Sequence, residues 1–525
     1  MKGKRNIELK KFCLTVALSV LCLSAWGQII INEFSAANST ILADPEFNDY
    51  SDWIELRNLG SEEQNLKGYY LSDNLNIPGK FRLGNDVIIA PGAYILIWAD
   101  GTNNGIHTNF KLSSLGEEIG LYSPSGELLD SVSYTEQKTD VSYGRLPGSD
   151  SIWAYFNQPT PKASNSSRAY VDFTSLLPEF SKKGGFYSSS FSVELSSAQG
   201  GLIRYTLDGS VPDENSAIYS TSIGVASTTI IRARIFEAEK IPGPSVTHSY
   251  FINENSIDAK LPVVSIATEP ENFWDPNKGI YVQSFKPLWE IPINIELFEN
   301  DGSDRAAFNE LAGSKVNGLY SWKLPQKMLG IYFKKKYGKG SLDYPIIHQR
   351  KRSSYKSFAL RASGSDWSLS LIRDMLAQHT TLLNMNIDIM GYRPAIVYVN
   401  GEYLGIHNIR EKVDDDYIEK SYQQEPGSFD LVENESYAEA GNLEAYRHLE
   451  SLLSADLSDA AAYNAVAELV DIENFTDFVI AEMATQNISI DHNVMAWKPK
   501  ESGKWKWILM DVDRGFYAPS RELIS

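Results

Sequence analysis

The chain has 525 residues and a formal net charge of −19, with 43% hydrophobic and 22% charged residues. This composition is ordinary for folded proteins, so wholesale disorder is excluded, and the length predicts several domains. The acidic balance argues against nucleic acid, or an anionic membrane surface, as the main partner.

Residues 1–27 have the pattern of a secretory signal peptide. A basic start precedes an apolar run over 12–25, and small residues at Ala25 and Gly27 predict cleavage after Gly27. The apolar run is short for a membrane span, and no later segment is long and apolar enough to be one. Both cysteines lie in this segment, so the mature chain is expected to have no disulfide. We therefore predict a protein that is secreted or held at the cell surface.

Residues 28–165 alternate short apolar runs with turn residues, which is typical of an all-β sandwich. Three stretches, 31–34 (INEF), 52–58 (DWIELRN) and 68–73 (GYYLSD), resemble the lamin-tail domain, an immunoglobulin-like sandwich. The resemblance implies an attachment or binding module without chemistry of its own. Glu33 and Asp52 are weighed as cation ligands, but solvated surface acids are the favoured interpretation.

Residues 172–252 predict a second, smaller β-sandwich. Alternating strands are expected at 191–195, 203–207 and 230–236, with a turn at Asp208-Gly209. The stretch 205–212 (YTLDGSVP) is similar to the small sandwich at the C-terminus of chitobiases and hexosaminidases. That module is an accessory, so we expect a spacer, with binding of a cell-wall or surface glycan as the alternative.

In residues 256–525 the sequence pattern changes from strands alone to strands and helices. Expected strands and a β-hairpin with a turn at Asn400-Gly401 come first, and amphipathic helices follow, which predicts an α+β domain with two lobes. The expected strands are 261–266, 293–298, 328–333 and 358–361, the hairpin is 396–407, and the helices are 369–382, 443–453, 460–469 and 474–487.

A pair of carboxylates follows an apolar and aromatic stretch near the end of the chain. Residues 505–510 predict a buried strand, and Asp511 and Asp513 stand directly beyond it. Asp491 and Asn493 offer further oxygens on a loop upstream. Oxygen donors suit a hard cation such as Mg²⁺ or Mn²⁺, and protein kinases place an acid, an amide and a metal-binding Asp in this order. The spacing alone also fits acids that cap a turn.

Several motifs in this segment resemble the spore-coat protein H (CotH) kinase family, an atypical branch of the protein-kinase-like fold. They are 325–327 (PQK), 360–366 (LRASGSD), 371–374 (LIRD), 398–405 (YVNGEYLG), 410–412 (REK), 491–493 (DHN) and 511–513 (DVD). The resemblance implies transfer of the γ-phosphate of ATP to Ser or Thr hydroxyls of an acceptor protein, with a divalent metal ion.

The resemblance also implies roles for individual residues. Lys327 is expected to bind phosphate and Glu411 to hold that lysine, while Arg361 also faces the nucleotide. A solvated lysine, a surface ion pair and a structural arginine remain the respective alternatives. The other candidates are Asp491 and Asp511 as catalytic residues, with Asn493, Asp511 and Asp513 as metal ligands.

Two departures from the family pattern stand against activity. Trp322 stands where the family has an arginine, with Lys323 next, and the family continues with helices beyond Asp513, so the domain is expected to be incomplete at its C-terminus. The chain is thus predicted to be two immunoglobulin-like sandwiches followed by an atypical kinase-like domain, by analogy bacterial. The alternative is a non-catalytic surface or matrix scaffold with a degenerate kinase-like domain.

Overall fold

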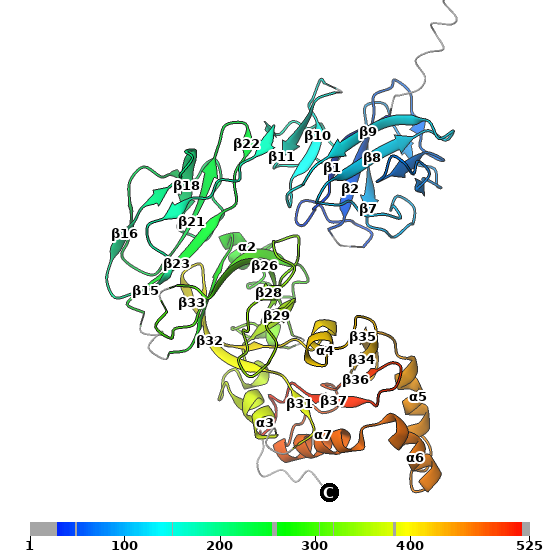
Figure 1. Cartoon of the computed structure of the whole chain (residues 1–525), viewed down its shortest axis with the longest axis vertical. Helices are drawn as coiled ribbons and strands as arrows, with labels where there is room; N and C mark the ends of the chain where they lie inside the picture. The colour runs from blue at the N-terminus through cyan, green and yellow to red at the C-terminus, as the bar shows by residue number, and fades with distance from the viewer. Residues whose placement is uncertain are drawn as a thin grey trace, which may run out of the picture. The chain divides into compact units, whose positions relative to one another are not determined.

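The computed structural model describes residues 29–47, 50–149, 151–254, 260–303, 305–318, 320–381 and 385–516. The predicted signal peptide lies outside these residues. The described part is mostly β-structure with few helices (Figure 1). It divides into an N-terminal unit, which contains residues up to 176 together with 235–244, and a C-terminal unit, which contains 177–234 and everything from 245 onward. The segment 172–252 therefore contributes to both units.

Two sheets of the N-terminal unit share one apolar core. Ile31 and Ile54 enter this core from the first sheet, and Leu71 and Leu121 enter it from the second. The first sheet, in spatial order, is β12 (Ala169–Tyr170), β11 (Trp153–Phe156), β10 (Ser142–Arg145), β1 (Ile29–Ser35), β2 (Asp52–Asn58) and β7 (Tyr94–Ala99). The second is β5 (Phe81–Arg82), β4 (Tyr70–Ser72), β8 (Glu117–Tyr122) and β9 (Leu128–Tyr134). Two short pairs complete the unit: β3 (Gln64–Asn65) with β6 (Ile88–Ile89), and β13 (Asp172–Phe173) with β22 (Lys240–Ile241).

Glu33 and Glu55 form a buried glutamate pair at opposed positions of β1 and β2. Burial raises the pKa of Glu33 to about 7 and that of Glu55 to about 8. The prediction that Glu33 is a solvated surface acid is therefore wrong, because its strand has both faces covered. Burial also raises the pKa of Asp52 to about 7, although its carboxylate accepts a hydrogen bond from the Asn38 amide.

The strands of residues 177–252 lead directly into the rest of the C-terminal unit. Gly209, in the predicted Asp208-Gly209 turn, has a φ of +90°, and a Cβ there would lie 2.1 Å from Asn400 Oδ1. Glycine therefore permits this turn to pack against the Asn400-Gly401 hairpin. The main sheet is β15 (Gly185–Tyr187), β23 (Val246–Ile252), β21 (Thr229–Phe236), β18 (Leu202–Thr206) and β19 (Ala217–Ile218). The remaining strands pair as β14 (Glu179–Phe180) with β17 (Leu195–Ser196), and β16 (Phe191–Val193) with β20 (Ile223–Val225).

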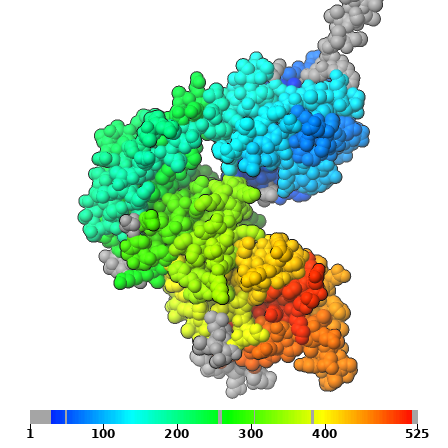
Figure 2. Space-filling model, viewed as in Figure 1, coloured from blue at the N-terminus to red at the C-terminus, as the bar shows by residue number. Residues whose placement is uncertain are grey.

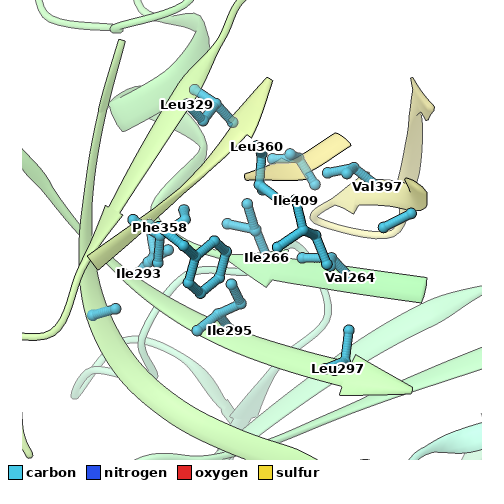
Figure 3. Packing of buried hydrophobic residues seen from close by; sticks show 14 of the residues in the cluster. Val264, Ile266, Ile293, Ile295, Leu297, Leu329, Phe358, Leu360, Val397 and Ile409 are labelled. Carbon is cyan, nitrogen blue, oxygen red and sulfur yellow. The ribbon is translucent and has the colours of Figure 1, made fainter. Parts of the chain in front are cut away.

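A closed barrel follows, and each expected strand of this region contributes to it. Antiparallel neighbours run from β24 round to β32, and parallel pairing of β24 with β32 closes the ring. The order is β24 (Val263–Ala267), β25 (Ile291–Phe298), β26 (Phe308–Val316), β27 (Leu329–Tyr332), β30 (Ser357–Arg361), β33 (Glu402–Arg410) and β32 (Tyr392–Val399). Alternate side chains fill its interior, among them Val264, Ile266, Ile293, Ile295, Phe358, Leu360, Val397 and Ile409 (Figure 3). The short pair β28 (Leu342–Asp343) and β29 (Ser354–Tyr355) and the helix α2 (Pro270–Trp274) are also in this region.

The C-terminal sheet has helices on both faces (Figure 1). Its order is β31 (Asp388–Ile389), β37 (Lys506–Leu509), β36 (Met495–Pro499), β34 (Phe429–Glu433) and β35 (Tyr437–Ala440). One face packs on α3 (Arg373–Thr381), α5 (Glu444–Leu453), α6 (Ala460–Leu469) and α7 (Ile472–Thr485), and the other on α4 (Asp415–Ser421). In Figure 2 the orange surface of the C-terminal unit adjoins its red surface, which belongs to the last described residues. None of the helices in the described ranges has the length and apolarity that crossing a membrane requires.

Candidate functional site

Asp511 and Asp513 lie where the chain leaves β37. Ile508 and Leu509 are buried in that strand, as the sequence predicts. Asp511 has a φ of +51°, so the chain turns there, and Val512 is buried between the two acids. The buried valine anchors the turn in the core below it, while the Asp511 side chain keeps 32% of its surface exposed.

Arg361, the last residue of β30, links the two acids. Its Nη2 donates to Asp511 Oδ1 and, at 2.8 Å, to Asp513 Oδ2. The Ser365 amide donates to the same Asp513 oxygen at 2.8 Å. Gly364 makes this approach possible: it has a φ of +54°, and a Cβ there would lie 2.1 Å from Asp513 Oδ2. The structure therefore brings together three of the predicted site residues.

Asp374, in the first turn of α3, supports this arrangement from below. Its Oδ1 accepts hydrogen bonds from the Val512 amide at 2.9 Å and from Gln378 at 2.8 Å. Its Oδ2 lies 3.1 Å from Nη2 of Arg410, which is 1% exposed, and 3.9 Å from Nε of Arg361. We call Arg361, Asp374, Arg410, Asp511 and Asp513 the acid–arginine cluster. Sequence reasoning placed Asp374 and Arg410 in motifs but gave neither a role.

Burial and the neighbouring charges act in opposite directions on the pKa values of the acid–arginine cluster. Burial raises the pKa of Asp513 to about 6, although the charge of Arg361 opposes this rise. Burial also acts on Asp374, yet the charges of Arg410 and Arg361 hold its pKa below the usual value. Although burial opposes the charge of Arg361, Asp511, Asp374 and Asp513 raise its pKa, so the guanidinium stays charged.

The upstream loop reaches the same turn through Asn493. Its Nδ2 donates to the backbone oxygen of Asp511 at 3.2 Å, which leaves the amide oxygen of Asn493 as a possible ligand. Asp491 is 79% exposed and bonds to the ring of His492, which lowers the pKa of Asp491. The structure thus places Asn493 at the acid–arginine cluster and Asp491 on the exposed side of the loop.

The ion pair expected between Lys327 and Glu411 is not formed. The Lys327 ammonium donates to the backbone oxygens of Trp322 and Leu324, and no carboxylate in the described part of the chain lies within 4.0 Å of it. Burial lowers the pKa of Lys327. Glu411 Oε2 instead accepts from Arg350 Nε at 2.8 Å and from the Gly391 amide at 2.7 Å. Glu411 is also fully buried, so the alternative of a surface ion pair is wrong as well.

Trp322, which stands where the resembled family has an arginine, packs against the barrel core. The ammonium of Lys323 lies 5.4 Å from the centroid of the Trp322 ring. The Trp322 side chain therefore contributes to packing, and Lys323 is the cation next to it.

Sequence reasoning also missed Glu482, a buried acid in α7. Burial raises its pKa to about 7, and the nearby charge of Asp511 contributes to the rise. Its sequence signal is weak, because the buried face of α7 also contains the polar residues Asn474 and Thr485. Asp511, Asp513 and the Asn493 amide offer oxygen donors, the type that Mg²⁺ and Mn²⁺ prefer, but Arg361 Nη2 already contacts one oxygen of each acid.

Comparisons with known families match three segments of the chain. Residues 24–136 match Lamin Tail Domain, 182–247 match Chitobiase/beta-hexosaminidase C-terminal domain, and 315–523 match CotH kinase protein. No curated protein matches the chain. The third match spans β27 to the Asp511–Asp513 turn and so contains the whole acid–arginine cluster. From N- to C-terminus, the chain therefore carries segments that match the lamin tail, chitobiase/hexosaminidase C-terminal and CotH kinase families, in the order that its motifs predict.

Proposed function

We propose that the C-terminal segment is an atypical protein kinase, which transfers the γ-phosphate of ATP to Ser or Thr hydroxyls of a protein. The observation that carries this proposal is the pair Asp511 and Asp513 gathered on Arg361 directly after β37, inside the segment that matches CotH kinase protein. Phosphoryl transfer depends mainly on positioning and on balancing phosphate charge, and this turn concentrates the groups that do both.

Asp511, Asp513 and Asn493 are the residues that would hold Mg²⁺ or Mn²⁺. The bound metal would neutralise charge on the β- and γ-phosphates. Arg361 balances part of the negative charge of the two acids, so they stay close together before any nucleotide binds. Asp374 holds the Val512 amide and thereby fixes the turn. The protein's own contribution is therefore a rigid, partly exposed set of oxygens.

Asp491 is the proposed group that orients the acceptor hydroxyl and takes its proton. Its exposure on the loop leaves it accessible to another protein, and its lowered pKa keeps it ionised. Arg361 and Lys327 are the proposed phosphate contacts. Because Glu411 is committed to Arg350 and Gly391, Lys327 would make that contact without the predicted glutamate partner.

The two preceding segments are proposed to attach the kinase to a surface. The pattern of residues 1–27 supports export with cleavage after Gly27. The matches to a lamin tail domain and to a hexosaminidase accessory domain support an attachment role, with a cell-wall or surface glycan as one partner.

Phosphate transfer from γ-labelled ATP tests the proposal. The mature chain is incubated with Mg²⁺ or Mn²⁺ and a generic acceptor protein, beside Asp511→Asn and Asp491→Asn. The matched control is Asp301→Asn, because Asp301 is an exposed loop acid in the same unit. Labelling that Asp511→Asn and Asp491→Asn abolish, and that the control retains, would support the proposal.

If no phosphate transfer is seen, ATP binding measured on the same samples separates two explanations. Binding of ATP without transfer would refute the assigned catalysis while keeping the nucleotide site. If the chain neither binds ATP nor transfers phosphate, the kinase proposal is refuted. A scaffold with a degenerate kinase-like domain then remains.

A further inference from the structure

A second cluster of potential metal ligands lies in the N-terminal unit, in a segment to which the comparisons assign no chemistry. Asp44, Asp100 and His107 each offer one ligand atom, and these three atoms lie within 4.8 Å of one another. His107 Nδ1 is 2.7 Å from Asp100 Oδ2 and 3.6 Å from Asp44 Oδ2. Asp44 and His107 are 0% and 1% exposed.

The orphaned oxygen of Asp44 is the observation that points to a ligand. Its Oδ1 accepts from the Glu46 amide at 2.9 Å, but its Oδ2 is buried without a hydrogen-bond donor among the described residues. A buried carboxylate oxygen that lacks a donor is costly, and a bound cation would remove that cost. A charged imidazolium does not remove this cost, because its Nδ1 proton would point to Asp100, at 2.7 Å, and not to Asp44, at 3.6 Å.

The other ring nitrogen of His107 has the partner that a metal-bound histidine usually has. Glu46 Oε2 lies 2.9 Å from Nε2. When Nε2 carries the proton and donates to this carboxylate, Nδ1 has a lone pair that faces the oxygens of Asp100 and Asp44, where a cation can bind between them. This is the common outer-shell arrangement of metal-binding histidines. Phe47 covers the ring with an edge contact at a centroid distance of 4.9 Å.

Both loops of the cluster are held in place by apolar packing. Leu42, two residues before Asp44, and Ile106, directly before His107, pack on the buried cluster of Trp53, Leu96 and Trp98. The Thr102 amide also fixes Asp100 by donating to its Oδ1 at 2.9 Å. Packing and hydrogen bonding within the protein thus position the ligand atoms before an ion binds.

We propose that Asp44, Asp100 and His107 bind a first-row divalent transition-metal ion such as Zn²⁺. Nitrogen with carboxylate oxygen favours such an ion over Mg²⁺ or Ca²⁺, which take oxygen donors alone. Donors about 2.0–2.1 Å from a tetrahedral ion lie about 3.3 Å apart, so the observed separations of 2.7 and 3.6 Å need shifts of about half an ångström. The ion would clamp the loop at Asp44 to the loop at His107 and stabilise the N-terminal unit.

Zinc titration of the mature chain by calorimetry tests this proposal. Excess Mg²⁺ is present throughout, and Asp511→Asn is included, so that binding at the acid–arginine cluster is recognised. We expect one Zn²⁺ per chain with a dissociation constant in the micromolar range or below, retained in Asp511→Asn. Asp44→Asn, which keeps the side-chain volume, should weaken binding at least about 100-fold, and Glu46→Gln about 10- to 100-fold. Asp86→Asn, an exposed acid of the same unit, should leave it unchanged.

Hydrogen exchange of the unsubstituted chain gives an independent readout, in case Asp44→Asn does not fold. Zn²⁺ should slow exchange in residues 42–47 and 100–107 and leave the acid–arginine cluster unchanged. X-ray absorption at the zinc edge should show nitrogen and oxygen neighbours with an imidazole signature. No zinc binding in the micromolar range, or binding that Asp44→Asn leaves unaltered, would overturn the proposal.

Discussion

Replacing Asp374 with asparagine isolates one charge at the centre of the acid–arginine cluster. The asparagine oxygen can still accept from the Val512 amide and from Gln378, as Asp374 Oδ1 does. The change therefore removes the negative charge that faces Arg410 and Arg361 and little else.

The expected loss follows from the burial of Arg410. Its guanidinium is 1% exposed and lies 3.1 Å from Asp374, and no other ion pair is formed by Arg410 in the described part of the chain. Two unit charges at that distance attract by about 5 kcal/mol at an effective dielectric constant of about 20. Breaking a buried pair by removing one partner typically costs about 3–5 kcal/mol. We expect Asp374→Asn to lower the free energy of local opening by that amount.

Hydrogen-exchange mass spectrometry is the suitable assay, because a chain of several units does not unfold in one two-state step. Peptides from α3, β33 and β37 should exchange faster, and those from the N-terminal unit should not. Asp86→Asn, which breaks the exposed pair with Lys67, is the control and should cost less than about 1 kcal/mol.

A double variant gives the decisive comparison. Asp374→Asn combined with Arg410→Met removes both charges, so it should lose less stability than Asp374→Asn alone. A loss below about 1 kcal/mol for Asp374→Asn, or a double variant that loses the sum of the two single variants, would refute the reasoning.

Three further predictions concern other buried sites. The folded state keeps the proton of Glu55 up to a pKa of about 8, against 4.5 ordinarily. The contribution of Glu55 to the stability of the N-terminal unit should therefore fall by about 3–5 kcal/mol as the pH rises through that window, and Glu55→Gln should remove this part of the fall, measured by hydrogen exchange of peptides from β1 and β2 at several pH values. Gly364→Ala should cost about 1–3 kcal/mol and reduce phosphate transfer, because its Cβ meets the Asp513 carboxylate in a strained conformation; unchanged labelling would contradict this. Glu411→Gln should destabilise the C-terminal unit by about 3 kcal/mol through its lost pair with Arg350, measured by hydrogen exchange of peptides from β33; weaker ATP binding at unchanged stability would instead support the predicted lysine–glutamate pair.

Local sequence patterns were sufficient for many elements of the C-terminal unit. Residues 293–298 alternate apolar and polar side chains and lie in β25, and the Asn400-Gly401 turn joins β32 to β33. The four expected helices correspond to α3, α5, α6 and α7, with ends that differ by a few residues. Closure of the barrel was not predictable in this way, because the parallel pairing of β24 with β32 joins residues more than 100 positions apart.

The candidate site likewise has one part that a local sequence pattern predicted and one part that depends on contacts between distant residues. The Asp511–Asp513 turn was predictable because a buried strand followed by acids is a local pattern. The partner of Glu411 was not, because Arg350 reaches it from a loop 61 residues away. The sequence analysis paired Glu411 with Lys327, and only the packing of the folded chain shows that Arg350 is the cation facing this buried glutamate.

The sequence by itself determined the order of the three segments, several strands, four of the helices, and the position of the acids beyond β37, because periodicity and turn residues act over short distances. Only the tertiary structure decided which charges meet. It buried Glu33, placed Asp374 under the Asp511–Asp513 turn, and brought Asp44 to His107 across 63 positions, because long-range packing and desolvation determine these pairs.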